Sequence, residues 1–208
     1  PISSSGVGLA SSSALAVGVL NALFAYEGIQ LSPEQLAKYA CQIEIECLKN
    51  PIGIQDQYAV AYGGLKRYRF HADGKVGVSP VVVKPEIIAN LEKNFMLFYT
   101  GITRVSSQIL GEQKQNINQK IMTLDQMTRM VDEAIDVLQQ GDIDSWGYLL
   151  DKAWNLKKQM SSQISNPQIE RIYELGKNAG ALGGKILGAG GGGFFLFYVP
   201  EKRQNHVR

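Results

Sequence analysis

The chain has 208 residues, of which 45% are hydrophobic and 19% are charged, a balance typical of a globular protein with a sizeable core. The formal net charge is +2 and no long basic run occurs, so nothing in the charge pattern favours binding to a nucleic-acid backbone. No apolar run is long enough to span a membrane, and no signal-peptide pattern is present. We therefore expect a soluble cytoplasmic protein that binds neither nucleic acid nor membrane.

The first residue bears on whether the chain is complete, and the two cysteines bear on whether it contains a disulfide or a zinc site. Pro1 stands where an initiator methionine is expected, next to a Ser/Gly-rich motif, so we expect part of a longer chain. Cys41 and Cys47 are six residues apart on one predicted helix, where their side chains point in different directions. This spacing favours neither a disulfide nor a zinc site and predicts two reduced thiols in the core.

Residues 3–14 form a Ser/Gly-rich stretch that leads directly into an apolar segment, residues 15–26. Gly6 and Gly8 allow backbone N–H groups to converge on one point, and serines 11–13 are able to cap the helix that follows. A helix N-terminus adds N–H donors and a partial positive charge, so the pattern predicts a phosphate cradle. The helix is apolar on nearly every side and is expected to be buried. The alternative is a flexible linker or a frayed terminus.

A second helix is predicted from Ser32 as N-cap and Pro33 as first helical residue, with Gln35 completing the capping pattern, to about Leu48. A period of 3.6 residues places Leu36, Ala40, Ile43 and Cys47 on its apolar face. Glu44 falls on the same face, where a carboxylate is costly unless it meets a cation. Glu44 is therefore either half of a structural ion pair or a metal ligand.

Residues 51–58 form an irregular turn that runs into a short apolar helix ending at Gly63-Gly64. Asp56 lies where the loop becomes helical, and the first-turn N–H groups there would keep its carboxylate ionised. Asp56 is either a helix-capping residue or a functional carboxylate.

A β-hairpin follows, with strands predicted at residues 65–70 and 76–83 around the turn signal Asp73-Gly74. His71, beside the turn, is expected to be a surface residue. A short helix over residues 85–90 then leads to a predicted domain boundary near residue 90.

The apolar run Phe95 to Tyr99 predicts a buried strand, and the polar turn 100–107 leads from it into a helix. Arg104 in this turn is suited to clamping a phosphate and equally to pairing with a surface acid.

Three helices follow in the order of the chain, from Ile117 to Gly141, from Asp142 onward, and from Pro167 to about Gly180. The first is amphipathic and is expected to pack on a sheet, with a coiled-coil role as the alternative. The second carries Trp146 and Trp154 on its inner side, and we expect both in the core.

Residues 183–193 are rich in glycine and precede a strand at residues 194–199. Gly188, Gly190 and Gly193 match the pattern G-x-G-x-x-G, but a strand follows where a dinucleotide-binding turn requires a helix. The pattern instead predicts a strand-loop-strand whose backbone approaches another loop closely.

Together these motifs resemble those of the GHMP kinases. Residues 8–14 resemble the phosphate loop of that family and residues 183–193 its C-terminal glycine motif, while residues 51–58, 100–104 and 180–194 are most similar to bacterial D-glycero-D-manno-heptose 7-phosphate kinases. The resemblance implies an α+β, two-domain GHMP kinase fold with ATP in the cleft between the domains. Residues 1–90 would form an incomplete N-terminal, ATP-binding domain, and residues 91–208 a ferredoxin-like C-terminal domain. The family's first motif is absent from this sequence.

The resemblance also implies roles for individual residues. Ser12 and Glu44 would hold Mg²⁺, and Asp56 would be the catalytic aspartate. The cradle that binds the ATP phosphates would consist of Gly6, Gly8, Leu9, Ala10, Ser11, Ser12 and Ser13. The substrate would be bound by Arg104, Gly190 and Gly191.

The activity implied is transfer of a phosphoryl group from ATP to the anomeric hydroxyl of D-glycero-D-manno-heptose 7-phosphate, giving the 1,7-bisphosphate. Two alternatives remain: a fucokinase-like kinase of an unphosphorylated sugar, and a sugar or ATP sensor that has lost catalysis. A homodimer is one candidate assembly.

Overall fold

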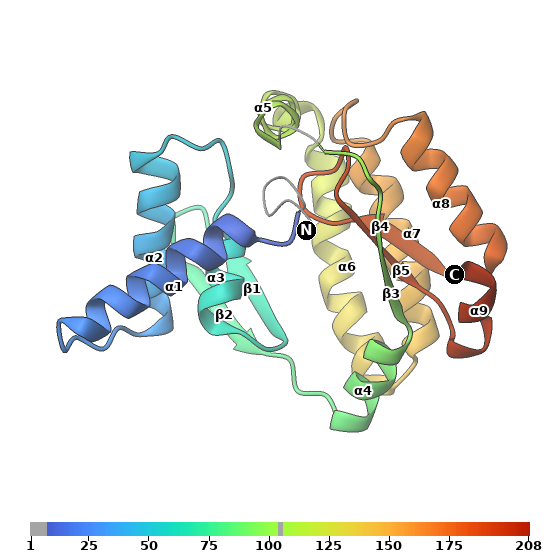
Figure 1. The fold of residues 1–208 in the computed structure, drawn as a ribbon, viewed down its shortest axis with the longest axis horizontal. Coiled ribbons are helices and arrows are strands. Elements are labelled where there is room, and N and C mark those ends of the chain that lie inside the picture. Colours follow the sequence, from blue (N-terminus) through green and yellow to red (C-terminus); the bar gives the residue numbers. More distant parts are fainter. Residues whose placement is uncertain (1–7, 104–105) are drawn as a thin grey trace. The chain divides into compact units, whose positions relative to one another are not determined.

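A computed structural model describes residues 8–103 and 106–208 of the chain (Figure 1). These residues divide into two compact units: residues 10–81 form the first, and residues 8–9 with 82–208 form the second. The family domain ranges 1–90 and 91–208 stay predictions. No helix in the described part of the chain is both long and apolar enough to cross a membrane.

The first unit contains three α-helices, a π-helix and a β-hairpin. These are α1 (Ser11–Tyr26), α2 (Pro33–Cys41), the π-helix η1 (Gln42–Cys47), α3 (Gln55–Tyr62), β1 (Lys66–Phe70) and β2 (Val76–Pro80). The strands pair antiparallel, with Lys66 opposite Pro80 and Phe70 opposite Val76, which confirms the hairpin predicted from Asp73-Gly74. Tyr68 and Phe70 meet aromatic rings of α3 edge to face, so one face of the hairpin packs on that helix.

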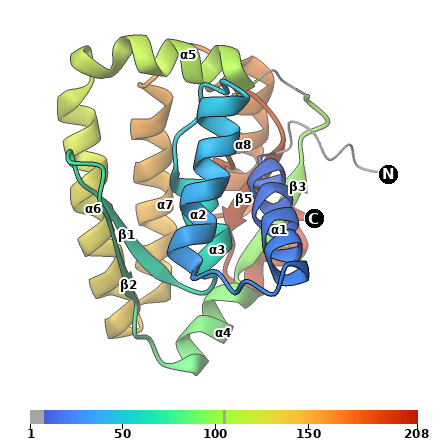
Figure 2. The same cartoon turned by 90° about the vertical axis from the view of Figure 1, so that its left-hand side faces the viewer.

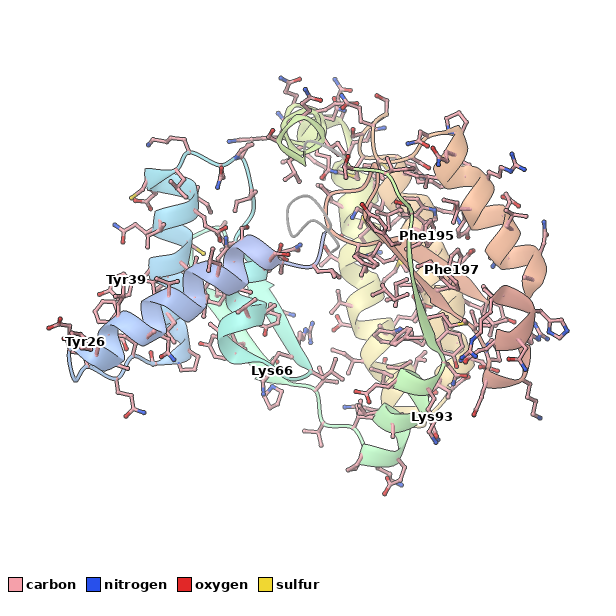
Figure 3. All side chains as sticks on the ribbon, viewed as in Figure 1. Tyr26, Tyr39, Lys66, Lys93, Phe195 and Phe197 are labelled. Carbon is pink, nitrogen blue, oxygen red and sulfur yellow. The ribbon has the colours of Figure 1, made fainter. Side chains whose placement is uncertain are left out.

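The helix α1 is less buried than its composition predicts. Val17 joins Leu36 and Ala40 in a small core cluster. The outer side of α1, in contrast, exposes Leu15 by 68% and Tyr26 by 88%, and Figure 3 shows Tyr26 at the end of the helix pointing away from its unit. The prediction that α1 is buried on all sides is wrong for these residues, because α2, η1 and α3 cover it from one side.

The capping pattern at Ser32 is confirmed, but the α-helix that it starts is shorter than predicted. Ser32 Oγ accepts a hydrogen bond from the Gln35 N–H at 3.3 Å, and Gln35 Oε1 accepts one from the Ser32 N–H at 2.9 Å. From Gln42 the chain winds as a π-helix, in which the Leu48 N–H donates to the Ile43 carbonyl at 2.9 Å. The wider turn rotates later side chains, so Ile43 and Cys47 are exposed although they were predicted on the apolar face.

Both cysteines are free, but only Cys41 is partly buried; Cys47 is exposed, so its predicted core position is wrong. Burial, followed by the nearby Glu44 carboxylate, raises the pKa of the Cys41 thiol to about 11. Because the thiolate is the charged form, on the order of 1 in 10³ Cys41 side chains is a thiolate at pH 8. We therefore expect iodoacetamide at pH 8 to alkylate Cys47 well before Cys41, as followed by peptide mass spectrometry. Equal rates at the two sites would contradict this.

The second unit is a three-stranded antiparallel sheet with helices, in the strand order β3-β5-β4. Its elements are α4 (Pro85–Lys93), β3 (Phe95–Tyr99), α5 (Ser106–Asn116), the 3-10 turn η2 (Ile117–Gln119), α6 (Ile121–Gln140), α7 (Ile143–Lys158), α8 (Pro167–Ala179), β4 (Gly183–Ile186), β5 (Phe194–Tyr198), the 3-10 turn η3 (Glu201–Arg203) and α9 (Gln204–Val207). Figure 2 shows α5 lying across the ends of α6 and α7. The mixture of helices and sheet in the two units confirms the α+β class.

The boundary predicted between the two long helices, at Gly141 and Asp142, is confirmed. Gly141 ends α6 with φ 78°, and the Asp142 carboxylate caps α7 by accepting from the Ser145 N–H at 3.2 Å. The helix predicted from Ile117 begins as a 3-10 turn and becomes α-helical only at Ile121. It packs on α7, and its Leu138 also joins a core cluster with Tyr198 of β5.

Aromatic residues of β5 form the centre of the second unit. Phe195 and Phe197 stack with ring centroids 4.4 Å apart (Figure 3), and Trp154 meets Phe195 edge to face. Trp154 is fully buried as predicted, whereas Trp146 is only half-buried. The other face of the sheet is more open.

The strand β3 was predicted to be buried. This prediction is wrong for the side chains of β3 that point to the open face of the sheet. Leu97 and Tyr99 are 48% and 40% exposed, while Phe98, which alternates with them, packs on Phe197. Residues of one strand point alternately to the two faces, so the continuous apolar run does not mean burial on both sides.

Because Gly183 has no side chain, the backbone of β4 lies directly against the backbone of α7. A Cβ atom on Gly183 would lie 2.0 Å from the Gly147 carbonyl oxygen and 2.7 Å from the Asp151 nitrogen. We expect Gly183→Ala to lower the free energy of unfolding by about 3 kcal/mol, because backbone atoms of α7 would have to move. Urea unfolding followed by tryptophan fluorescence measures this. In the control Gly111→Ala, whose Cβ meets nothing within 4 Å, stability should rise by about 1 kcal/mol. A loss at Gly183 no larger than 1 kcal/mol would contradict the close packing.

Candidate active site

The described part of the predicted phosphate cradle is a turn that enters α1 through left-handed backbone conformations. Gly8 has φ 82°, and Ala10, the N-cap of α1, has φ 54° and ψ 28°. The N-cap makes no side-chain hydrogen bond, so the predicted capping by Ser11–Ser13 is wrong. Leu9, Ser11 and Ser12 are exposed, and Gly6 lies outside the described residues. A helix N-terminus without a side-chain cap offers its N–H groups to an anion.

Ala10 holds a conformation that costs an L-residue about 1–2 kcal/mol relative to the right-handed region. Glycine removes this cost but loses more chain entropy on folding, so we expect Ala10→Gly to raise the free energy of unfolding by about 0.5–1 kcal/mol. The matched control Ala14→Gly, inside α1, should lower it by about 1 kcal/mol. Thermal unfolding of both variants measures the difference, and equal effects of the two variants would contradict the strain at Ala10.

Three buried polar side chains from three different helices meet in the first unit. Ser13 Oγ donates to Glu44 Oε2 at 2.8 Å, and Gln57 Nε2 donates to the same oxygen at 2.6 Å. All three residues are at most 2% exposed. Glu44 Oε1 and Gln57 Oε1 have no hydrogen-bond partner among the described residues. Two buried oxygen acceptors without donors are costly unless a cation or another donor joins them.

The local structure explains how these side chains are brought together. Ser13 lies in the first turn of α1, Glu44 on the π-helix η1, and Gln57 in the first turn of α3. π-Helical turns occur frequently at functional sites, because the additional residue in the turn redirects a side chain. Here the residue that the turn directs inward is Glu44.

Asp56 immediately precedes Gln57 and is the acidic residue in the first turn of α3. It is half-buried, and it takes part in an interaction within the molecule. The N-cap of α3 is Ile54 and has no side-chain cap, so Asp56 is not the capping residue that its position in the sequence suggested as one alternative. Asp56 is thus the chain neighbour of Gln57, whose side chain donates a hydrogen bond to the buried Glu44 carboxylate.

The donors present fit Mg²⁺, which prefers oxygen ligands and is often held by one or two carboxylates together with phosphate oxygens. Glu44 Oε1 and Gln57 Oε1 are oxygens of this kind. No group of three or more His, Cys, Asp or Glu residues that could hold a metal occurs within residues 8–103 and 106–208. The hydroxyl bonded to Glu44 belongs to Ser13, while Ser12, which was expected to act with Glu44, is exposed, and its role in binding Mg²⁺ stays a prediction.

The glycine-rich loop between β4 and β5 lies in the second unit and is fixed by backbone hydrogen bonds. The Gly191 N–H donates to the Ile164 carbonyl at 2.7 Å, and the Gly193 N–H donates to the Ile102 carbonyl at 3.0 Å. A Cβ on Gly190 would lie 3.0 Å from the Ile164 backbone. The predicted close backbone approach is therefore confirmed, and β5 follows the loop where a dinucleotide site would need a helix.

The same loop is hydrogen-bonded to Thr100, which lies just after β3. Thr100 donates to the Gly193 carbonyl from its backbone N–H at 2.9 Å and from its hydroxyl at 2.8 Å. Arg104 itself lies outside the described residues. The roles of Gly190, Gly191 and Arg104 in binding substrate stay predictions.

Sequence reasoning did not single out Gln57, nor Ser13 as the partner of Glu44. A glutamine in a short helix reads as a surface residue, and three consecutive serines give no indication of which one points inward. Two signals pointed to the cluster: the position of Glu44 on an apolar helix face, and the metal-binding role that the family resemblance implied for Glu44.

Comparisons with known proteins agree with these features. The GHMP kinases N terminal domain family matches residues 3–64, and the GHMP kinases C terminal family matches residues 134–208. The chain is 36% identical to the D-glycero-alpha-D-manno-heptose 7-phosphate kinase of Campylobacter jejuni over 98% of this chain and 61% of that protein. It is 32% identical to the L-fucokinase/L-fucose-1-P guanylyltransferase of Bacteroides fragilis over 98% of this chain and 22% of that protein.

Solved structures give the same picture. The crystal structure of a D-glycero-D-manno-heptose 1-phosphate kinase from Bacteroides thetaiotaomicron superposes with a TM-score of 0.73 at 26% identity, over 98% of this chain and 56% of that one. The chain thus spans about three fifths of the length of the heptose phosphate kinases that it matches.

Proposed function

The chain belongs to the GHMP kinase family, and we propose that the protein is an ATP-dependent kinase that phosphorylates the anomeric hydroxyl of D-glycero-D-manno-heptose 7-phosphate. The observation that carries this proposal is the buried Ser13–Glu44–Gln57 cluster with Asp56 beside it at the start of α3. A kinase needs a carboxylate at the metal and, in many cases, a second carboxylate at the acceptor hydroxyl, and Glu44 and Asp56 are suited to these two tasks.

In the proposed reaction, the N–H groups at the start of α1 bind the β- and γ-phosphates of ATP. The anomeric oxygen of the sugar forms a bond to the γ-phosphorus, and the bond between that phosphorus and the β–γ bridging oxygen breaks. Asp56 accepts the proton of the hydroxyl, and ADP leaves with the electron pair of the broken bond. An anomeric hydroxyl is more acidic than other sugar hydroxyls, so a carboxylate is an adequate base.

Glu44 would hold Mg²⁺ with its second oxygen, and Gln57 would add its amide oxygen. When bound, the ion would neutralise the charge of the β- and γ-phosphates during transfer. Ser13 and Gln57 keep the Glu44 carboxylate in one orientation through their two hydrogen bonds.

The specificity for a heptose 7-phosphate is proposed from the similarity to the Campylobacter jejuni enzyme. The second candidate is a fucokinase-like kinase of an unphosphorylated sugar, which the similarity to the Bacteroides fragilis enzyme favours. A sensor without catalysis is the third, and two carboxylates kept at the cluster argue against it.

The test is an assay of ADP release by the full-length protein with Mg-ATP and a panel of heptoses, hexoses and their phosphates, followed by NMR location of the new phosphate. Turnover with heptose 7-phosphate and a phosphate on its anomeric carbon is the expected result. Turnover only with unphosphorylated sugars would favour the fucokinase-like alternative, and no ADP release with any sugar would favour the sensor.

A further inference from the structure

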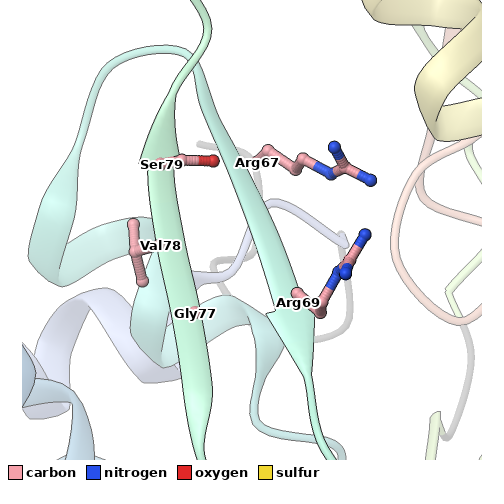
Figure 4. A pocket seen from close by; sticks show the side chains of 5 residues that line it. All are labelled: Arg67, Arg69, Gly77, Val78 and Ser79. Atoms are coloured by element: carbon pink, nitrogen blue, oxygen red, sulfur yellow. The ribbon is translucent and has the colours of Figure 1, made fainter.

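The hairpin β1–β2 carries a pair of arginines on the face opposite to α3. Tyr68 and Phe70 contact Tyr62 and Tyr58 of α3, so the residues that alternate with them, Arg67 and Arg69, point to the other side. Figure 4 shows both guanidinium groups extending from the same side of the strand, on the side to which Ser79 also points. Arg67 already takes part in an interaction within the molecule, whereas Arg69 is exposed and extends beside it.

A pocket of about 320 Å³ lies on this face and is lined by Arg67, Arg69, Gly77, Val78 and Ser79. None of these five residues is acidic. Asp73, at the tip of the hairpin, is paired with Lys75 at 2.9 Å, so its charge is already neutralised. The pocket therefore combines two guanidinium groups with a hydroxyl, which is the chemistry that binds a phosphate or another dianion.

Gly77 gives a second, independent reason to expect a ligand here. It lies in the middle of β2 opposite Arg69, and its φ is not positive, so the backbone does not require glycine. The three atoms nearest to a Cβ there would belong to Arg69 and His71, at ordinary contact distances of 3.7–3.8 Å. Glycine weakens a strand and often marks a place where a ligand approaches the backbone closely. The missing side chain leaves the floor of the pocket open beside Arg69.

We infer that this hairpin pocket binds the phosphate monoester of the sugar substrate, with Arg69 as its principal ligand and Arg67 and Ser79 beside it. Arg67 is half-buried and already takes part in an interaction within the molecule, so the test rests on Arg69, which is exposed. The volume of about 320 Å³ accommodates a phosphate together with part of a sugar. The identity of the sugar that carries the phosphate rests on the proposed function. The binding of a phosphate group in this pocket does not.

The experiment compares the full-length protein with three variants. Arg69→Gln removes the principal charge, and Gly77→Val fills the floor of the pocket with a residue that strands favour. Lys66→Gln is the matched control, because it removes one positive charge from the same strand on the face that packs toward α3. Unfolding in urea first establishes that all three variants fold.

Binding is measured by titration calorimetry and by the arginine Nε–Hε signals in NMR spectra, with inorganic phosphate, mannose 6-phosphate, mannose and Mg-ATP as probes. We expect the two phosphates, but not mannose, to shift the Arg69 signal. Arg69→Gln and Gly77→Val should weaken mannose 6-phosphate binding at least about tenfold, and Lys66→Gln by less than twofold. In the kinase assay, KM for the sugar phosphate should rise by a similar factor with kcat nearly unchanged.

Each possible failure has its own signature. Equal losses in Lys66→Gln and Arg69→Gln, or an Arg69 signal that mannose shifts as strongly as its phosphate, would overturn the pocket. A response of Arg69 to Mg-ATP alone would assign the pocket to the nucleotide and would also overturn it. Normal turnover of heptose 7-phosphate in Arg69→Gln and Gly77→Val would leave the kinase proposal standing without the pocket. Phosphate binding at Arg69 without turnover of any sugar would leave the pocket standing without the kinase proposal.

Discussion

Replacing Asp56 by asparagine is expected to lower kcat by about 10³-fold while leaving the affinity for Mg-ATP within about twofold of the original. Asparagine has the same shape but cannot accept the proton of the sugar hydroxyl. Asp56 is half-buried in the first turn of α3, and an amide is accommodated there without a change in volume. Single-turnover measurements with a sugar that the assay has identified as substrate separate the chemical step from binding.

The matched control for this variant is Asp73→Asn, in the exposed turn between β1 and β2 of the same unit, where the same change of charge occurs outside α3. It should leave kcat within about twofold, since surface substitutions seldom disturb a distant reaction. Near-normal turnover in Asp56→Asn would exclude Asp56 as the base, and a parallel loss of Mg-ATP affinity would show that it acts on the nucleotide instead.

Replacing Glu44 by glutamine is expected to lower kcat by about 10²-fold or more and to raise the Mg²⁺ concentration needed for half-maximal rate. Glutamine retains one oxygen that accepts from Ser13 and Gln57, so the network that holds the three helices persists. Its NH₂ group would take the position of Glu44 Oε1, the oxygen without a partner. A donor in that position repels a cation, and the negative charge that attracts the ion is lost.

The control is Glu46→Gln, which lies two residues further along the same π-helix and is exposed. ADP release is followed over a range of Mg²⁺ concentrations for both variants. An unchanged Mg²⁺ requirement in Glu44→Gln, or an equal change in Glu46→Gln, would remove Glu44 from the metal site.

Features that depend on neighbours in sequence were predictable. Ser32, Pro33 and Gln35 form a capping box whose atoms lie within one turn, and Gly141 and Asp142 mark a helix boundary by local geometry. The helical period also predicted that Glu44 points inward, but it placed Ile43 and Cys47 on the same face, and the π-helix leaves both of these exposed. The family resemblance rested on such local motifs and is confirmed by the matched domain families.

Features that depend on distant partners were not predictable. The π-helix at Gln42–Cys47 has no pattern in a single sequence, because the same residues are compatible with an α-helix. The exposure of Leu15 depends on which segments cover α1, and the pairing of Ser13 with Glu44 joins residues 31 positions apart. Composition and periodicity contain no information about such partners.

The π-helix has a consequence for how homologous sequences are compared. A π-helical turn is equivalent to an α-helix into which one residue has been inserted, so the register between the Ser32 cap and Asn50 depends on the number of residues as much as on their type. A homologue with a regular helix here would be one codon shorter, and an alignment without a gap would pair Glu44 with its neighbour. Superposition of the backbones, rather than residue counting, is needed to identify the equivalent carboxylate.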